Sequence, residues 1–308
     1  MRFITNWVVA TFILCFLVIL AGGIVRTTQS GMGCPDWPRC FGKWIPPLNA
    51  SELPPDFEKY LSKQDIDHSF NAWHTWIEYI NRLLGVLLGL FAMVQAAALF
   101  FKRKKLTNAW RLSLAFLLAV ILTGLFGAIV VKYNLAHLSV SVHLLFAIVL
   151  VQVQLALYLV LTNKYKVHVL NSRVKKMVFV FLCIIFIQSI LGTMVRMHVD
   201  DISKMLGYRQ RELWLNNYPL VFLIHRSFSW VLLAIALWLA WLNRNTREVK
   251  NIFFALACTI LLSMSTGIIL SNAGMPAPAQ PLHLLLAAIA VTLSVAIVLQ
   301  TKPASVSQ

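Results

Sequence analysis

Eight long apolar runs, separated by short polar stretches, dominate the pattern of this chain. A run of about 20 apolar residues is long enough to cross the hydrocarbon core of a bilayer as a helix. The pattern therefore predicts an all-α polytopic membrane protein with eight transmembrane helices. The runs cover residues 3–25, 76–100, 110–131, 139–162, 175–196, 219–242, 250–271 and 281–301.

Composition agrees with this pattern, since 59% of the 308 residues are hydrophobic and the formal net charge is +16. The basic residues gather in the loops that follow the second, fourth and sixth runs. Short basic loops mark the cytoplasmic side, so we expect both termini to be cytoplasmic. Topology and anionic lipid headgroups account for the basic excess without a nucleic-acid partner. These loops carry Lys102–Lys105 and Arg111; Lys164, Lys166, Arg173, Lys175 and Lys176; and Arg244, Arg247 and Lys250.

The first run favours a retained helix over a cleaved signal peptide. It is long, ends in Gly22-Gly23-Ile24-Val25-Arg26, and has no small-x-small cleavage site before the next polar stretch. The chain also begins without an Arg- and Ser-rich leader, so a mitochondrial transit peptide is not expected. These features predict a multi-pass protein of a bacterial plasma membrane.

Glu78 is the only acidic residue inside any of the eight runs. Asn81 and Arg82 follow three and four residues later, so all three polar groups share one helix face. An ionisable group at membrane depth is costly and marks a functional site by default. The alternative is a Glu–Arg pair that only neutralises itself near the interface.

The first outer loop, about residues 27–75, contains Cys34 and Cys40 on the oxidising side of the membrane. We favour a structural or regulatory disulfide there, because nothing nearby obviously lowers a thiol pKa. The alternative is a reactive dithiol that exchanges electrons with a partner. The remaining cysteines lie mid-span and read as small apolar residues.

Three histidines lie inside apolar runs, namely His143, His225 and His283. Each falls in the first turns of a run that begins on the outer side, at the depth of Glu78. Neighbouring Ser residues or backbone carbonyls could satisfy each histidine separately, but a common depth favours a shared role.

An internal repeat relates the two halves of the chain. An even number of spans per half makes the repeats parallel, so we predict two pseudo-symmetric four-helix bundles, residues 1–165 and 166–308. The matches are His143-Leu144-Leu145 with His283-Leu284-Leu285, Asn81-Arg82 with His225-Arg226, Val25-Arg26 with Val195-Arg196, and Thr123-Gly124 with Thr266-Gly267.

The second half has the residues for a bis-His haem. His225 and His283 come from neighbouring even spans at matched depth, as the two axial positions of a low-spin haem require. No Cys, Asp or Glu lies at that depth to complete a zinc site. Arg226 and Arg196 could pair with the haem propionates.

The first half is not a copy of the second. His143 matches His283, but Asn81 replaces the second ligand, and the carboxylate of Glu78 is added where the second half has Phe222. An open iron position beside an acid–base group permits reaction, whereas a saturated iron favours electron transfer. The pattern predicts a reacting half and an electron-transfer half.

Taken together, these motifs resemble the haem A synthase family over nearly the whole chain. The resemblance rests on Gly22-Gly23-x-Val25-Arg26-x-Thr28, on Cys34…Cys40 with Asp36-Trp37-Pro38, on Glu78-x-x-Asn81-Arg82, on His225-Arg226, and on His143 and His283. It implies two four-helix bundles and oxidation of a ring methyl of the substrate haem O to a formyl group.

The same resemblance implies roles for individual residues. Haem b lies between His225 and His283 and relays electrons, and the substrate haem takes His143 as a ligand. Glu78 acts on protons or on a cationic intermediate, while Arg82 and Arg26 pair with the substrate propionates. The two haem sites lie toward the outer side of the membrane.

Asn81 stands where the family motif has His, which leaves His143 as the one strong ligand of the substrate haem. We favour a branch that works with a single His, because Glu78 and Arg82 are retained. The alternatives are that His74 supplies the second ligand, or that the protein is a relative without synthase activity.

Two other functions compete with this interpretation. A di-haem b-type cytochrome would only transfer electrons, but it predicts two complete His pairs. A transporter with Glu78 as its proton-coupling group would leave the aligned histidines unexplained. Candidate partners are membrane lipid, the farnesyl transferase that makes haem O, and a quinone or other electron acceptor. The sequence leaves the oligomeric state open, a homo-oligomer included.

Overall fold

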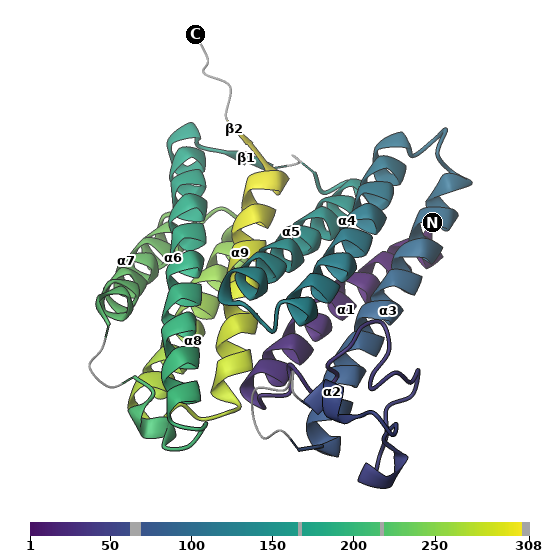
Figure 1. Ribbon diagram of the computed structural model, residues 1–308. Helices are drawn as coiled ribbons and strands as arrows, with labels where there is room; N and C mark the ends of the chain where they lie inside the picture. Colours follow the sequence, from purple (N-terminus) through teal and green to yellow (C-terminus); the bar gives the residue numbers. More distant parts are fainter. Residues whose placement is uncertain (62–68, 166–167, 216–218, 304–308) are drawn as a thin grey trace. The chain divides into compact units, whose positions relative to one another are not determined.

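The computed structural model of the chain describes residues 1–61, 69–165, 168–215 and 219–303 (Figure 1). Within them, eight helices are long and apolar enough to cross a membrane, which confirms the predicted all-α, eight-span architecture. These helices are α1 (Arg2–Thr27), α3 (Ala72–Phe100), α4 (Thr107–Lys132), α5 (His137–Leu161), α6 (Ser172–Met205), α7 (Leu220–Leu242), α8 (Lys250–Asn272) and α9 (Ala279–Gln300).

Short elements complete the described chain. Two of them, η1 (Ala50–Glu52) and α2 (Glu58–Leu61), lie in the loop between α1 and α3, and η2 (Arg211–Leu213) precedes α7. We call the loop between α1 and α3 the outer loop, after the side on which the sequence predicts it. Strands β1 (His168–Leu170) and β2 (Thr301–Pro303) pair in parallel, with His168 opposite Thr301. Residues 62–68 of the predicted outer loop, and Lys166 of a predicted basic loop, lie outside the described residues.

The fifth span differs most from its expected bounds of 175–196. Helix α6 has 34 residues, about 50 Å at the rise of an α-helix, whereas the hydrocarbon core is about 30 Å thick. Its last turns carry Asp200, Asp201 and Lys204. The apolar run ends near Arg196, but the backbone hydrogen bonds of the helix continue through these polar residues.

Contacts between residues divide the chain into two compact units, Met1–Gln154 (unit 1) and Leu155–Gln308 (unit 2). In unit 1, α3 packs against α1 and α4. The buried Gln95 of α3 and Gln154 of α5 exchange two amide hydrogen bonds of 3.1 and 2.8 Å. Gln154 also donates to the carbonyl of Val8 in α1 at 3.0 Å. These hydrogen bonds therefore join three helices. In a bilayer they matter because apolar side chains pack as well against lipid as against another helix.

Unit 2 contains a closed ring of four helices. α6 packs on α7, α7 on α8, α8 on α9, and α9 on α6. The β1–β2 pair lies at one end, where the Lys175 ammonium donates to the carbonyl of Thr301 at 2.7 Å. Such a ring encloses side chains from all four helices, as a bundle core that holds a cofactor requires.

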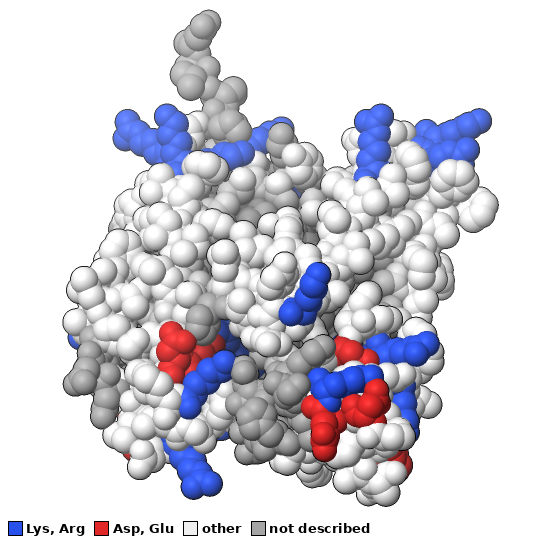
Figure 2. All heavy atoms as spheres, in the orientation of Figure 1, with Lys and Arg blue, Asp and Glu red and all other residues white. Residues whose placement is uncertain are grey.

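Charge is unevenly distributed along unit 1. In unit 1, the turn between α3 and α4 and the outer loop lie at opposite ends (Figure 1). Lys102–Lys105 lie at the first of these ends, whereas the described acidic residues of the unit gather at the second with a few basic ones (Figure 2). The apolar surface between the two ends matches a helix bundle in a bilayer.

Candidate functional site

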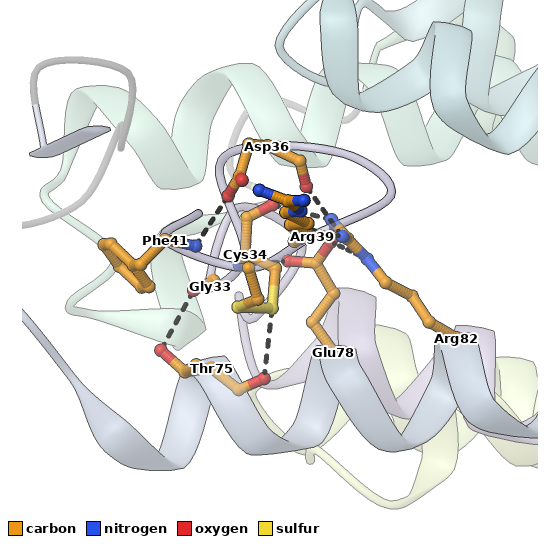
Figure 3. A network of polar contacts seen from close by, with 9 residues as sticks. Gly33, Cys34, Asp36, Arg39, Phe41, Thr75, Glu78 and Arg82 are labelled. Carbon is orange, nitrogen blue, oxygen red and sulfur yellow. Dashed lines mark hydrogen bonds and ion pairs between the residues drawn. A yellow bond between two sulfur atoms is a disulfide. The ribbon is translucent and has the colours of Figure 1, made fainter. Parts of the chain in front are cut away.

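Glu78 and Arg82 form an ion pair on one face of α3, near its N-terminal end (Figure 3). Asn71 caps the helix, accepting hydrogen bonds from the backbone N–H groups of Trp73 and His74 at 3.0 and 3.3 Å. Glu78 lies in the second turn and is 4% exposed. Its Oε1 accepts from Nε and Nη2 of Arg82 at 3.1 and 2.6 Å. The spacing of four residues along the helix makes this contact possible.

The guanidinium of Arg82 also binds three backbone carbonyls of the outer loop (Figure 3). Nη1 donates to the carbonyls of Asp36 and Arg39 at 2.7 and 3.0 Å, and Nη2 donates to the carbonyl of Cys34 at 2.6 Å. With the two bonds to Glu78, these contacts use all five N–H groups of the guanidinium. In this arrangement Arg82 has no N–H group left for a substrate carboxylate.

The loop that Arg82 binds is closed by the predicted Cys34–Cys40 disulfide, which the structure confirms. We call residues 33–42 the disulfide loop. Inside it, the Asp36 carboxylate accepts from the backbone N–H groups of Phe41 and Gly42 at 2.6 and 2.9 Å. Phe41 is fully buried against Tyr60 and Phe70. The disulfide loop therefore has its own small core and internal hydrogen bonds.

The start of the disulfide loop lies directly on the backbone of α3. A Cβ atom at Gly33 would lie 2.3 Å from the carbonyl oxygen of His74, so only glycine fits there. The Thr75 hydroxyl donates to the carbonyl of Gly33 at 2.9 Å, and the Cys34 N–H donates to Oε2 of Glu78 at 2.7 Å. Both oxygens of Glu78 are thus held, one by Arg82 and one by the loop.

His143 of α5 and Asn81 of α3 bring further polar groups to unit 1. Among the described residues, nothing forms a hydrogen bond with the buried Nδ1 of His143 or the buried Oδ1 of Asn81. A Cβ built on Gly127 of α4 would lie 3.5 Å from Cε1 of His143, whereas one built on Gly22 of α1 would meet open space. Buried polar atoms without a partner in the protein are able to interact with a bound group.

Unit 2 brings the two predicted haem ligands together. The rings of His225 in α7 and His283 in α9 have centroids 6.4 Å apart. Two iron–nitrogen bonds of about 2 Å each, together with the two ring radii, give a centroid separation of roughly 6 Å. The pair therefore fits an iron between two imidazoles. The described residues contain no cluster of three His, Cys, Asp or Glu that could hold a metal ion without a macrocycle.

Two groups of α8 at the Nδ1 atom of His283 fix the orientation of its ring. Its Nδ1 lies 2.9 Å from the carbonyl of Ser263 and 3.0 Å from the hydroxyl of Thr266, both in α8. Since a carbonyl can only accept, Nδ1 carries the proton and Nε2 keeps its lone pair for a metal. His225 has no such partner for its buried Nδ1 within the described chain, although Gln188 donates to its backbone carbonyl at 2.8 Å.

Each histidine ring lies against a glycine of the preceding helix. Cβ atoms built on Gly192 and Gly267 would lie 3.2 and 3.4 Å from Cε1 of His225 and His283. Gly127 precedes His143 by the same 16 residues that separate Gly267 from His283. The predicted match of Thr123-Gly124 with Thr266-Gly267 was therefore wrong by three residues, because the contact aligns Gly127 with Gly267.

The predicted propionate-binding arginines have different surroundings. Arg196 of α6 pairs through Nε with Asp200 at 2.9 Å and also contacts the side chain of Gln280 in α9. Arg226 is exposed, with its Cζ 5.8 Å from the ring centroid of Phe222. Arg26 lies half-buried in the last turn of α1. Their role toward a haem stays a prediction.

Sequence reasoning missed the residues that support these side chains. Ser263, Thr266 and Gly192 were not assigned to the haem site, and Gly33 and Thr75 were not connected with Glu78. The shared 16-residue spacing of Gly127–His143 and Gly267–His283 was an available signal for those two glycines, and it does not extend to Gly192 or Gly33. The backbone carbonyls that bind Arg82 and His283 leave no signal in a sequence.

Known proteins resemble this chain over most of its length. The family model described as COX15-CtaA, cytochrome oxidase assembly protein, matches residues 5–295. A protein named "Heme A synthase" from Orientia tsutsugamushi strain Boryong is 25% identical over 85% of this chain and 86% of its own length. Proteins of the same name from Rickettsia bellii strain RML369-C and Nitrosospira multiformis are 25% and 27% identical, over 91% and 85% of this chain and 93% and 81% of their own lengths. The chain belongs to the COX15-CtaA family of cytochrome oxidase assembly proteins.

Proposed function

We propose that this chain is a haem A synthase, which oxidises a ring methyl of haem O to a formyl group. The observation that carries the proposal is the contrast between the two units. Unit 2 presents a facing His pair, whereas unit 1 presents His143, Asn81 and a buried carboxylate. The named relatives support the same reaction.

His225 and His283 would hold a haem b in unit 2. Haem b with two histidine ligands transfers single electrons and leaves no iron position open for a substrate. The hydrogen bond from Nδ1 of His283 to the Ser263 carbonyl orients Nε2 toward the iron and makes it a stronger ligand. For the whole reaction, a methyl group and one water molecule would give the formyl group, four protons and four electrons. The electrons withdrawn in unit 1 would leave one at a time through this site to a quinone or another acceptor.

Unit 1 would bind the substrate haem O through His143. Asn81 is a poor iron ligand, so one face of the substrate iron would stay accessible. Arg26 would pair with a substrate propionate. The Glu78 carboxylate would accept a proton or stabilise positive charge at the reacting carbon, and water exclusion strengthens either effect.

The charge distribution supports an orientation in the membrane. Basic side chains at the α3–α4 turn would face the cytoplasm of a bacterial cell, and the disulfide loop would face the outer side. Both termini would then be cytoplasmic, and Glu78, His143, His225 and His283 would lie toward the outer surface. The farnesyl transferase that makes haem O is the partner expected to supply the substrate.

The activity can be tested in bacterial cells that make haem O and lack a haem A synthase of their own. Expression of this chain should produce haem A in the extracted pigments. Glu78→Gln keeps an oxygen acceptor for the Cys34 N–H but removes the charge, and it should lower haem A by about 10²-fold or more. Glu58→Gln, at an exposed acidic residue of the same outer loop, is the matched control and should retain the activity.

Two outcomes would contradict the proposal. Absence of haem A when the wild-type chain is expressed at a normal level would refute synthase activity. Haem A at the wild-type level in the Glu78→Gln variant would leave the activity standing but refute the role of this carboxylate.

A further inference from the structure

Arg82 and Arg226 occupy matched positions in the two halves, but they have different surroundings. Arg226 is exposed and contacts an aromatic ring. Arg82 uses all five N–H groups, two toward Glu78 and three toward carbonyls of the disulfide loop. Of these two arginines, only Arg82 has a guanidinium that is held in place by hydrogen bonds to the surrounding protein.

The three carbonyls bound by Arg82 come from both ends of the disulfide loop (Figure 3). Cys34 is one partner of the disulfide, and Arg39 precedes the other partner, Cys40. The carbonyl of Asp36 lies between them in sequence and is also bound. A planar guanidinium with five donors can span several carbonyls at once, which a lysine ammonium cannot do with the same geometry.

Glu78 completes this arrangement from the other side. Its Oε1 binds Arg82, and its Oε2 accepts from the backbone N–H of Cys34 at 2.7 Å. The close contact of Gly33 with the backbone of His74 leaves no space for this end of the loop to shift toward α3. The position of the carboxylate and the position of the disulfide loop are therefore coupled.

We propose that Arg82 is a positioning residue, which holds the disulfide loop on α3 and thereby fixes the Glu78 carboxylate, and does not bind a substrate propionate. The inference rests on the proposed function only in taking Glu78 as the functional group. Because coupling is reciprocal, a substitution that frees the loop also frees the carboxylate. How readily the disulfide loop opens therefore indicates how firmly the Glu78 carboxylate is held, and this can be measured without any haem.

The test measures how fast the disulfide is reduced in the purified full-length protein in detergent. Cys15, Cys183 and Cys258 are replaced by Ala, so that only the loop supplies thiols. Dithiothreitol donates two electrons and two protons, the Cys34–Cys40 bond opens to two thiols, and dithiothreitol closes to its cyclic disulfide. A polyethylene glycol maleimide then traps the thiols, and the mass shift on a gel gives the rate.

Arg82→Gln should accelerate reduction by about tenfold or more, because local opening of the loop no longer breaks hydrogen bonds to a charged group. Arg82→Lys should give an intermediate rate, since the charge remains but the fork of donors is lost. Arg226→Gln is the matched control and should leave the rate unchanged. The midpoint potential of the disulfide in Arg82→Gln should rise by about 30 mV for a tenfold change in the equilibrium constant.

An unchanged reduction rate in Arg82→Gln would overturn the proposal, as would an equal acceleration in Arg226→Gln. Loss of haem O retention with an unchanged rate would instead assign Arg82 to the substrate. If Arg82→Gln does not fold, Arg82→Lys and Glu78→Gln test the proposal instead. The disulfide of both variants should be reduced faster than that of the wild type, and unchanged rates in both would overturn the proposal. All of these rates are measured without haem A formation, so failure of the proposed function is distinguished from failure of this inference.

Discussion

Asn81 and His225 stand at matched positions of the repeat, and their side chains offer different groups to a bound haem. The imidazole of His225 lies 6.4 Å from that of His283 between ring centroids, whereas the Asn81 Oδ1 is buried without a hydrogen-bond partner in the described chain. A second difference lies behind the shared histidines. Thr266 contacts Nδ1 of His283, but Phe126 holds the matched position of the repeat in unit 1, and Nδ1 of His143 has no partner among the described residues. Unit 1 therefore offers a weaker and less rigid ligand set.

Asn81→His should give the substrate haem a second strong ligand. Gly22 faces open space where its counterpart Gly192 contacts His225, so an imidazole can be accommodated there. With haem O bound, we expect the wild-type protein to show a five-coordinate, high-spin component and the variant to convert it to a low-spin form. Optical and electron paramagnetic resonance spectra measure the change. An all-low-spin wild-type protein would contradict ligation by His143 alone.

In unit 2, each of two glycines lies against a histidine ring of the next helix. Gly192 of α6 and Gly267 of α8 each leave the space that an imidazole of the next helix occupies. A larger residue at either place must displace the ring by a few tenths of an ångström or more. In unit 2, each helix with a histidine therefore needs a neighbouring helix with a glycine, so that the imidazole has space beside a flat cofactor.

Gly192→Ala should weaken haem b binding, because the new methyl group would lie 3.2 Å from Cε1 of His225. We expect a lower haem-to-protein ratio and a shifted α-band in the reduced spectrum. Gly22→Ala is the repeat-matched control, since its methyl group would meet open space, and it should leave the haem b spectrum unchanged. Equal spectra of the two variants would show that the close contact at Gly192 is irrelevant to the haem.

The amide pair of Gln95 and Gln154 should contribute to the stability of unit 1. Gln95→Leu leaves the buried amide of Gln154 with fewer partners, so we expect a loss of about 1 kcal/mol in the free energy of unfolding. Thermal and denaturant unfolding in detergent provides the measurement. The double variant with Leu at both positions should lose less than the sum of the two single variants, and strict additivity would show that the pair is not coupled.

At the scale of the whole molecule, much of the architecture follows from one-dimensional patterns. Runs of apolar residues set the number of spans, and the two outer cysteines could be paired because few alternatives exist. His225 and His283 could be placed together because both fall in the first turns of neighbouring spans that are predicted to begin on the same side of the membrane. These inferences need only residue type and position along the chain.

Other features depend on backbone atoms, which a side-chain pattern does not reveal. The role of Arg82 was assigned to substrate propionates, but its donors bind carbonyls of a loop more than 40 residues earlier in the chain. The extension of α6 past Arg196 depends on backbone hydrogen bonds through a polar segment. The orientation of His283 depends on the backbone carbonyl of Ser263, which a residue of any type at that position would supply.

The central claim is that the two units hold haem differently, one as a bis-His cofactor and one as a substrate. The most direct measurement is the haem content and spin state of the purified protein, by pigment extraction and electron paramagnetic resonance. We predict one low-spin haem b per chain, together with haem O or haem A that has at least partly high-spin iron. Two stoichiometric low-spin b haems without any modified haem, or a colourless protein, would contradict the account.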